Sequence, residues 1–383
     1  MIYLIMFTLS CCSLYASTKY KSWIKPLLVV VALSLPCAMA AFRGLDVGTD
    51  VKVYAIYAYR DAATLPLPDY LNSYLDIAGV GYSLLTWLSA RLFHSFQLYL
   101  GILQLAVVVP VYCASRKINP GYEWASMLIY YLLLYALTLN AMKQSIALAI
   151  CYLAFAFLLD GRKWGYVIAV VVACLFHQTA IVFLIVYPCY QIFVNGGAEA
   201  GILTERRQKI FLAVMVSAVA LVFIAGPQLV RALSVLKDSY AYQVEHIGDG
   251  ELNESALVLL AAAALNFNWC RRDLAVAPFE GEDGRAQTLY VKKIYAFSFV
   301  MFTLGLVLMQ LNVVADSLGR FGYYFLLFGG AFLGAQMAAG GKRSHVGSLL
   351  VIMIFLAYFI FAFLIMKGGE VYPYETWVGN VFY

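Results

Sequence analysis

Long apolar runs alternate with short polar segments along the whole chain. Most runs approach the roughly 20 residues that a helix needs to cross a bilayer core. Backbone inside lipid must satisfy its own hydrogen bonds, which favours helices as the spanning elements. The pattern therefore predicts an all-α polytopic membrane protein of about twelve spans. The runs lie at about 2–17, 24–41, 97–115, 122–139, 142–159, 164–176, 178–194, 210–230, 255–269, 290–312, 321–340 and 346–366.

Segment 79–94, GVGYSLLTWLSARLFH, differs from these runs. It is shorter than a full span and carries Arg91 among its apolar residues. An amphipathic helix of this kind can lie along the membrane interface. We therefore expect a partly inserted helix here rather than a thirteenth span.

The positions of Lys and Arg predict the orientation, because these residues in short loops favour the cytoplasm. If 79–94 does not cross, all the basic-rich loops fall on one side. They are 18–25, 115–121, 160–164, 205–209, 270–293 and 340–345. The other side receives 42–78, with five Asp against three Lys or Arg, and 231–254, with five Asp or Glu against two. Both termini are then expected outside.

Composition agrees with a membrane class, since 63% of the 383 residues are apolar and 12% are charged. That charged fraction is about half that of a soluble domain. The net charge of +5 is scattered over short loops, so no nucleic-acid partner is expected. Without repeats or low-complexity tracts, we predict one integral membrane domain, 1–383. It has an outer loop at 42–78 and a linker-like cytoplasmic loop at 270–290.

The middles of the twelve runs contain no Asp, Glu, Lys or Arg. Ion-coupled transporters generally place ionisable groups at mid-membrane. A proton or sodium antiporter is therefore not expected.

Polar side chains instead collect at the predicted outer face. AFRGLDVGTD carries Arg43, Asp46 and Asp50. The two Asp are spaced i, i+4 and would share a face if the segment were helical. An ordinary solvated loop is the alternative interpretation.

A second cluster lies in LTLNAMKQSIALAI, where Asn140, Lys143 and Gln144 are spaced i, i+3, i+4. On one helix these side chains would project from the same face. Two amides and an ammonium suit phosphate or sugar oxygens. Lys143 could instead extend to the interface without a chemical role.

Two further sets lie on the same predicted side. His177, in ACLFHQTAIVF, stands at a turn between two runs. A lone histidine is usually structural, yet its unperturbed pKa is near neutrality. Asp316 and Arg320 are spaced i, i+4, which permits an ion pair. Alternatively, Arg320 offers a planar fork for a diphosphate.

Cations, carboxylates and a histidine at the outer lipid boundary suit one kind of substrate. Its apolar tail would lie in the bilayer and its phosphate at the interface. Polyprenyl-diphosphate-linked sugars have this form.

Four motifs, FRGLDVGTDVKVY, NAMKQSIALAI, LFHQTA and GRFGYYF, are followed by a tail containing VYPYE. In order and spacing they resemble the EpsG family, Wzy-like bacterial membrane proteins of exopolysaccharide, capsule and O-antigen assembly. The resemblance covers nearly the whole chain. It implies a GT-C-like fold and a polymerase at the outer face of the bacterial inner membrane. Such an enzyme transfers a growing glycan from undecaprenyl diphosphate to the terminal sugar of another lipid-linked repeat unit. A chain-length regulator and a flippase are the further partners it implies.

The resemblance also transfers site residues by position. Arg43 and Asp50 match the family's Arg and GTD elements, and His177 matches its FH element. Asn140 and Gln144 match the Asn and Gln of an NxxRQ-like helix.

Roles follow from the reaction, in which an acceptor hydroxyl attacks the anomeric carbon while diphosphate leaves. We expect Arg43, Lys143 and Arg320 to stabilise the charge that grows on the leaving group. Lys143 stands where the family usually has Arg, so it lacks the bidentate fork. Asn140, Gln144 and Asp316 are the expected substrate contacts.

The general base must reach the acceptor hydroxyl. Asp46, Asp50 and His177 remain equal candidates at this stage. We expect no cofactor and no obligatory metal, because a diphosphate already leaves readily and the chain lacks a DxD motif. Mg²⁺ held jointly by Asp46 and Asp50 is the alternative.

Other functions remain open. A glycan ligase would need nearly the same site and would differ in its acceptor. A lipid-linked glycan flippase would need a hydrophilic path through the spans. A membrane acyltransferase would need a catalytic histidine on the path of a cytoplasmic acyl donor, and a noncatalytic scaffold is the last alternative.

Overall fold

The computed structural model describes residues 1–195, 206–236, 250–271, 273 and 281–377. These residues form helices and no strands, apart from one isolated antiparallel bridge between Arg43 and Thr376. They divide into two compact units, which are described separately below. Unit 1 comprises Met1–Leu184 and Phe355–Tyr383, and unit 2 comprises Ile185–Ile354. The prediction of a single domain stays a prediction.

Eight helical segments among the described residues are long and apolar enough to cross a membrane. They are Ile2–Lys19, Ile24–Ala41, Phe96–Ile118, Met142–Leu159, Gln178–Asn195, Ala286–Val313, Ser317–Ala339 and Lys342–Ile365. Three shorter apolar helices are Lys163–Phe176, Ala213–Gln228 and Glu254–Cys270. The chain is thus an all-α polytopic membrane protein, as predicted, and the number of twelve spans stays a prediction.

Unit 1 contains the first helices of the chain and the C-terminal tail. Its elements are α1 Ile2–Lys19, α2 Ile24–Ala41, η1 Val51–Ala55, α3 Ile56–Thr64, α4 Leu67–Ala78, α5 Val80–Phe93, α6 Phe96–Ile118, α7 Glu123–Leu133, α8 Tyr135–Asn140, α9 Met142–Leu159, α10 Lys163–Phe176, η2 Gln178–Ile185, η7 Ile360–Ile365 and η8 Gly368–Glu370. Helix α2 packs between α1 and α6, and α9 packs between α6 and α10. Small residues let helices in lipid approach closely. Helices α2 and α6 are in close contact at Gly101, where an added Cβ would lie 3.4 Å from the Ala41 Cβ.

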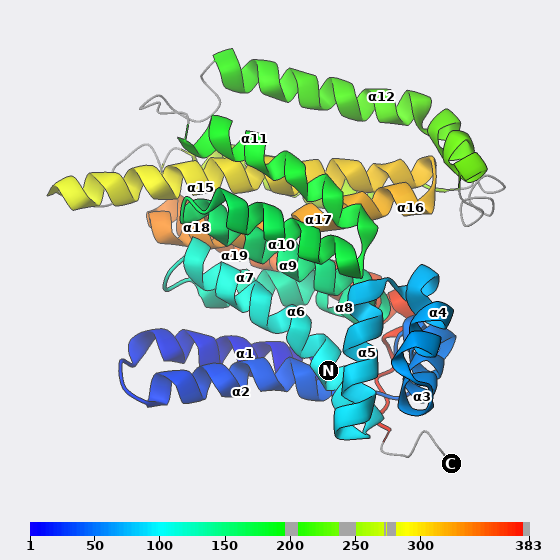
Figure 1. Ribbon diagram of the computed structural model, residues 1–383. Coiled ribbons are helices and arrows are strands. Elements are labelled where there is room, and N and C mark those ends of the chain that lie inside the picture. Colours follow the sequence, from blue (N-terminus) through cyan, green and yellow to red (C-terminus); the bar gives the residue numbers. More distant parts are fainter. Residues whose placement is uncertain (196–205, 237–249, 272, 274–280, 378–383) are drawn as a thin grey trace. The chain divides into compact units, whose positions relative to one another are not determined.

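The segment expected as the outer loop 42–78 is largely helical, since η1, α3 and α4 occupy most of it. The predicted helix at 79–94 is present as α5. Figure 1 shows α5 running across the ends of α1 and α2 rather than along them, as an interfacial helix would. Its depth in the membrane stays a prediction.

Arg91, the charge within α5, has a structural role. Its Nε donates to Ala62 O at 3.1 Å and its Nη2 donates to Leu65 O at 2.7 Å, while its guanidinium stacks over Trp87. The two carbonyls belong to the C-terminal end of α3, where backbone acceptors lack helical partners. Arg91 therefore caps α3 and fixes α5 against it.

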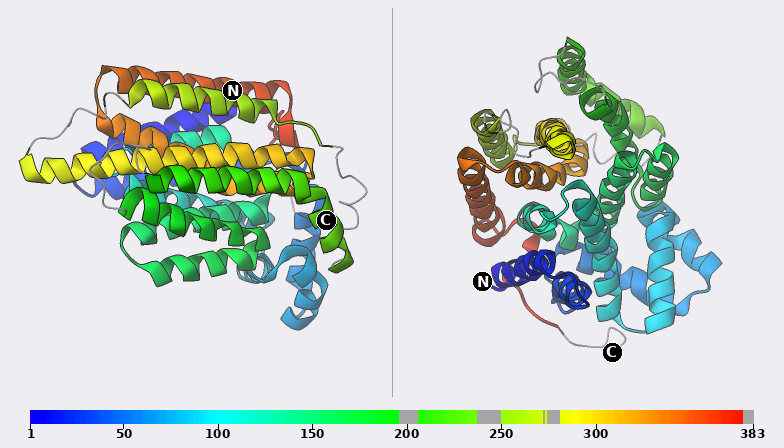
Figure 2. Two further views of the ribbon diagram at one scale, coloured as in Figure 1. Left: turned by 90° about the horizontal axis from the view of Figure 1, so that it is seen from above. Right: turned by 90° about the vertical axis from the view of Figure 1, so that its left-hand side faces the viewer.

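Unit 2 contains the remaining elements. They are α11 Val186–Tyr190, η3 Gln191–Asn195, α12 Arg206–Leu236, α14 Glu254–Cys270, α15 Gly281–Leu308, η5 Met309–Val313, α16 Asp316–Gly319, η6 Arg320–Gly322, α17 Tyr323–Leu326, α18 Phe328–Ala339 and α19 Lys342–Phe359, whose last residues belong to unit 1. Helix α15 packs against α14 and α18, and the rings of Phe267, Tyr295 and Phe332 stack in series between them. Figure 2 shows α14 and α19 side by side.

The linker-like loop predicted at 270–290 is shorter than expected. Residues 281–290 belong to α15, and 272 and 274–280 lie outside the described residues. The prediction assigned the polar sequence GEDGRAQ, residues 281–287, to a loop. A helix that extends beyond the apolar core can be polar on all sides. The polar residues from Gly281 onward therefore did not mark the beginning of α15.

Candidate functional site

The candidate site lies in unit 1, where the helix around Asn140 is interrupted. Helix α8 ends at Asn140 and α9 begins at Met142, with Ala141 at φ −82° and ψ 60° between them. The prediction that Asn140, Lys143 and Gln144 project from one helix face is therefore wrong. The break turns the three side chains toward different surroundings, and Gln144 is buried.

Arg43 satisfies one of the carbonyls that the break exposes. Its Nη1 donates to Leu139 O at 2.7 Å, and its Nη2 lies 3.1 Å from the sulfur of Met142. The side chain is 2% exposed, and its Nε has no hydrogen-bond partner among the described residues. Burial lowers the pKa of the guanidinium, which stays protonated nonetheless. A buried cation without a carboxylate ion pair in the described part of the chain thus stands at the break.

Gly48 permits this approach. It has φ +88°, and an added Cβ would lie 2.5 Å from Leu139 O and 3.4 Å from Arg43 Nη1. Only glycine adopts such a φ freely. The Gly of the GTD element therefore lets the loop lie against the carbonyl that Arg43 holds.

Asn140 binds the next residue of that element. Its Oδ1 accepts from Thr49 N at 2.7 Å and from Thr49 Oγ1 at 3.0 Å, and its Nδ2 donates to Ala136 O at 3.1 Å. The amide predicted to contact substrate is thus engaged with the loop. Its observed contacts are structural.

Asp50 is half-buried beside the break. Its Oδ2 accepts from Tyr54 Oη at 2.7 Å and from Met142 N at 3.4 Å. Burial raises the pKa of the Asp50 carboxyl, while these hydrogen bonds and the charges of Lys143 and Arg43 act in the opposite direction. Burial and the nearby Asp50 charge also raise the pKa of Tyr54. The arrangement holds a carboxylate with a raised pKa between two cations.

Lys143 extends over the same loop. Its Nζ donates to Ile77 O at 2.7 Å and lies 4.8 Å from the centre of the Tyr54 ring. Asp50, Tyr54 and Lys143 therefore form one contiguous group, called here the Asp50 cluster. It comes from the helix break and from the segment before α3.

His177 ends α10 near the other side of the α4–α5 junction. Its backbone is extended, and its Nδ1 lies 2.5 Å from Thr179 Oγ1. A Cβ added to Gly79 would lie 3.0 Å from Leu175 O and 3.5 Å from Phe176 O. The α4–α5 junction, whose Ile77 O accepts the hydrogen bond from Lys143, therefore packs against the end of α10 that precedes His177.

Asp46 lies in a turn and not in a helix, so it does not share a helix face with Asp50. It is exposed, with its Oδ1 3.5 Å from Lys52 Nζ. Lys52 also pairs with Glu370, at 2.8 Å, and the Glu370 hydrogen bond raises the pKa of Lys52. Asp46 and Asp50 therefore contact different partners, and joint Mg²⁺ binding by the two stays a prediction.

The C-terminal tail closes around the Arg43 segment. Gly48 N donates to Glu370 O, Gly44 N to Glu375 O at 2.6 Å, and Trp377 N to Phe42 O. Tyr3 of α1 donates to Val371 O at 2.7 Å. The tail that follows the last apolar run thus becomes part of the wall of the candidate site.

Asp316 and Arg320 belong to unit 2. Asp316 begins α16, and Arg320 begins η6 with an exposed side chain. Their roles in diphosphate and substrate binding stay predictions.

Sequence reasoning passed over three residues that line the Asp50 cluster or its rim. Tyr54 stands i+4 from Asp50, a spacing that indicates contact once the segment is known to be helical. Lys52 adjoins the GTD element and could have been included with it. Glu370 has no such signal, because 318 residues separate it from its partner Lys52.

Comparison with known proteins supports the resemblance seen in the motifs. The sequence matches the EpsG family over residues 26–376. No curated protein and no solved structure matches the chain.

Proposed function

Because the chain belongs to the EpsG family, we propose that this polysaccharide polymerase-type membrane protein works on lipid-linked glycans. It transfers a growing glycan from undecaprenyl diphosphate to the terminal sugar of another lipid-linked repeat unit. The reaction takes place at the outer face of the bacterial inner membrane, on a GT-C-like scaffold. A chain-length regulator and a flippase are the proposed partners.

One observation carries the proposal. Buried Arg43 and half-buried Asp50 and Lys143 converge on one helix break, where motifs about 90 residues apart in sequence meet. Burying a cation costs free energy unless it is paired, and the Arg43 Nε is left without a partner among the described residues. Fixed positive charge in a low dielectric is the arrangement that stabilises a developing anion.

In the proposed reaction, the acceptor hydroxyl oxygen forms a bond to the anomeric carbon. The bond from that carbon to the diphosphate oxygen breaks, and the electron pair leaves with the diphosphate. The hydroxyl proton passes to Asp50, whose raised pKa brings it closer to the operating pH that suits a general base. Asp46 and His177 remain the other candidate bases.

The cations divide the work in this proposal. Lys143 is only half-buried and can contact a diphosphate oxygen directly. Arg43 has both Nη groups engaged, so it acts through its charge and by holding the loop. Asn140 and Gln144 are the proposed substrate contacts of unit 1. The proposed roles of Arg320 in diphosphate binding and of Asp316 in substrate binding rest on their sequence motif alone.

The test is polymerisation of purified undecaprenyl-diphosphate repeat units by the reconstituted protein, read as a ladder on a gel. We expect a ladder that persists in EDTA and that Asp50→Asn abolishes. Asp160→Asn is the matched control, since it also removes one carboxylate charge, at the opposite end of α9 from the Asp50 cluster, where Asp160 pairs with Lys117 of α6.

Other outcomes would replace the proposal. Loss of the ladder in EDTA would support Mg²⁺ at Asp46 and Asp50. If authentic substrate gives no ladder while labelled lipid-linked glycan changes leaflet, the protein is a flippase. Transfer to a different acceptor would identify a ligase.

A further inference from the structure

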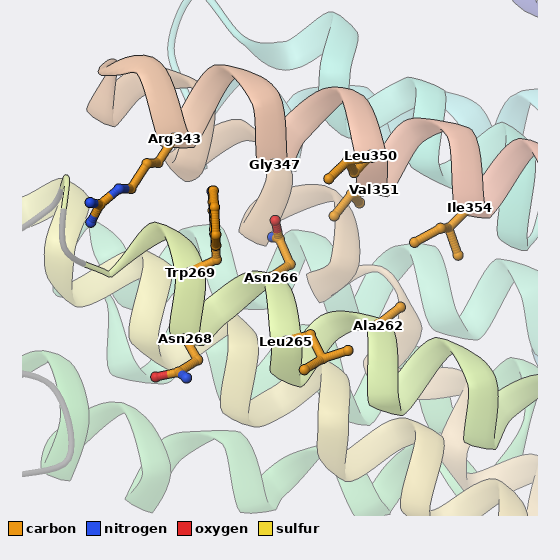
Figure 3. A pocket seen from close by; sticks show the side chains of 10 residues that line it. All are labelled: Ala262, Leu265, Asn266, Asn268, Trp269, Arg343, Gly347, Leu350, Val351 and Ile354. Carbon is orange, nitrogen blue, oxygen red and sulfur yellow. The ribbon is translucent and has the colours of Figure 1, made fainter.

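Unit 2 contains a cavity of about 540 Å³ between α14 and α19 (Figure 3). This size is within the range of small-molecule sites. Its lining is mostly apolar, and among the described residues that line it none is acidic. The lining side chains used below are Leu265, Trp269, Arg343, Leu350, Val351 and Ile354.

Among the lining residues the cavity is charged at one end only, and the polar Asn266 farther along donates to Gln336 at 2.6 Å. Arg343, at the start of α19, lies over the Trp269 ring with 5.9 Å between the guanidinium carbon and the ring centre. Figure 3 shows Leu350, Val351 and Ile354 following along α19 away from that end. The cavity therefore combines a cationic, aromatic entrance with an apolar body.

Further positive charge surrounds the entrance. Cys270 Sγ donates to Arg343 O at 3.4 Å, so Arg271, which follows Cys270, lies near the start of α19. Lys342 is exposed beside Arg343. Asp273, an acidic residue, also contacts this end of α19, where its Oδ2 accepts from Ser344 N at 2.9 Å. Among the described residues, Arg343 itself has no carboxylate ion pair.

The length of the cavity matches one leaflet of a bilayer. Arg343 and Ile354 are eleven positions apart on a helix, which at 1.5 Å per residue is about 16 Å. Half of a bilayer core is about 15 Å. An acyl chain whose headgroup lies at Arg343 would therefore reach to the level of Ile354, near the middle of the span Lys342–Ile365.

Helix α19 has its side chains available to lipid. An 18-residue window of the span Lys342–Ile365 has a mean hydropathy of 2.9, yet only 22% of that window is buried within the protein. Leu265, Leu350 and Trp269 are all exposed. The open side of the cavity is thus apolar surface that lipid would cover.

We propose that this cavity holds one anionic glycerophospholipid, with its phosphate at Arg343 and one acyl chain along α14 and α19. Arginine donates in a fork to phosphate oxygens, and basic pockets between membrane helices bind anionic headgroups. Trp is enriched at the membrane–water interface. The contact of Trp269 with Arg343 therefore agrees with a position of the lipid headgroup at this end of the cavity. The site shares no residue with the Asp50 cluster, and the proposal does not depend on the polymerase activity.

The test measures retention of phosphatidylglycerol and of phosphatidylcholine with the same acyl chains by native mass spectrometry of the detergent-purified full chain. We expect phosphatidylglycerol to be retained preferentially. Arg343→Gln should weaken its binding about fivefold, since a basic residue near an anionic lipid contributes about 1 kcal/mol. Lys342→Gln removes the same charge from the same end of α19, but Lys342 does not line the cavity, so this variant should have a smaller effect.

A second variant addresses the apolar body without changing charge. Leu350→Trp should fill the cavity and reduce retention of phosphatidylglycerol. Monodisperse elution of the variant at the volume of the wild-type protein would show that the fold persists. Equal losses in Arg343→Gln and Lys342→Gln would indicate diffuse attraction to the basic end of α19 and overturn the site. Retention of a polyprenyl phosphate in place of phosphatidylglycerol would overturn it too. A change of oligomeric state in Leu350→Trp with unchanged lipid retention would assign the surface to a second copy of the chain.

Discussion

Asn140 Oδ1 accepts both the backbone N–H and the hydroxyl of Thr49, at 2.7 Å and 3.0 Å. This pair joins the residue that ends α8 to the centre of the GTD element. The same break in the helix presents Leu139 O to Arg43 and Met142 N to Asp50. One interruption at Ala141 thus organises contacts to three residues of the Arg43–Asp50 segment.

Asn140→Ala should destabilise the protein by about 1.5–4.5 kcal/mol, because it removes two hydrogen bonds to Thr49 and one to Ala136, each worth about 0.5–1.5 kcal/mol. The measurement is thermal unfolding in detergent. Asn140→Asp is the matched variant, since it keeps the acceptor oxygen for Thr49. Equal losses in the two variants would show that the Thr49 contacts contribute little.

Gly48→Ala should destabilise the protein more than Gly121→Ala. Both glycines have positive φ, +88° and +83°, so both substitutions carry the cost of a left-handed residue, about 1–2 kcal/mol. Only the Cβ at position 48 meets Leu139 O, at 2.5 Å, whereas nothing lies within 4 Å at position 121. We expect Gly48→Ala to cost about 1–3 kcal/mol more, the usual range for overpacking.

Thermal unfolding of the two Gly→Ala variants in parallel measures this difference. If they lose equal stability, the loop relaxes away from Leu139 without cost. The close approach inferred for the Arg43 segment would then be wrong.

Lys143→Gln should slow polymerisation by about 10²–10³-fold, the usual effect of removing one donor to a developing anion. Lys143→Arg keeps the charge and restores the residue expected for the family, so it should remain active. Initial rates on lipid-linked repeat units test both variants. Lys117→Gln is the charge control, and unfolding midpoints separate a loss of the Ile77 hydrogen bond from a loss of catalysis.

An active Lys143→Gln enzyme would remove Lys143 from the diphosphate site. The proposed division of work would then leave Arg43 and Arg320 as the cations.

The helices were predictable because hydrophobic burial in lipid is a property of composition over many residues. Each of the twelve apolar runs is mainly helical where it is described, with single turn residues at Leu134 and Leu327. The boundary at 140–141, between the runs 122–139 and 142–159, was predictable in the same way, and Ala141 leaves the helical region there. The contacts at this boundary were not predictable, because Arg43, Thr49 and Asp50, which satisfy its backbone and side-chain groups, come from a distant part of the sequence.

The candidate site was predictable in part, since the motifs marked Arg43, Asp50, Asn140 and Lys143, which the fold brings together. Their orientation was not predictable, because a buried polar group turns toward whichever partner the tertiary structure supplies. Asn140 turns to Thr49. The return of the tail, which brings Glu370 to Lys52, depends on long-range packing for which no local pattern exists.

The pH dependence of polymerisation should identify the base. Asp50 accepts a proton only when ionised, so activity should rise as pH rises through its pKa. Burial raises that pKa, and the Tyr54 hydrogen bond lowers it. Tyr54→Phe removes a contact that favours the carboxylate. The acid limb of the rate profile should therefore move to higher pH, with activity recovering at the alkaline end.

Two further variants make this assignment decisive. Asp50→Asn should lose about 10²–10⁴-fold in rate, the usual contribution of a general base, and should show no comparable acid limb. His177→Gln should keep the limb of the wild-type enzyme. If instead His177→Gln removes the limb while Tyr54→Phe leaves it in place, His177 is the base. Asp50 would then serve to hold Met142 and Tyr54 at the helix break.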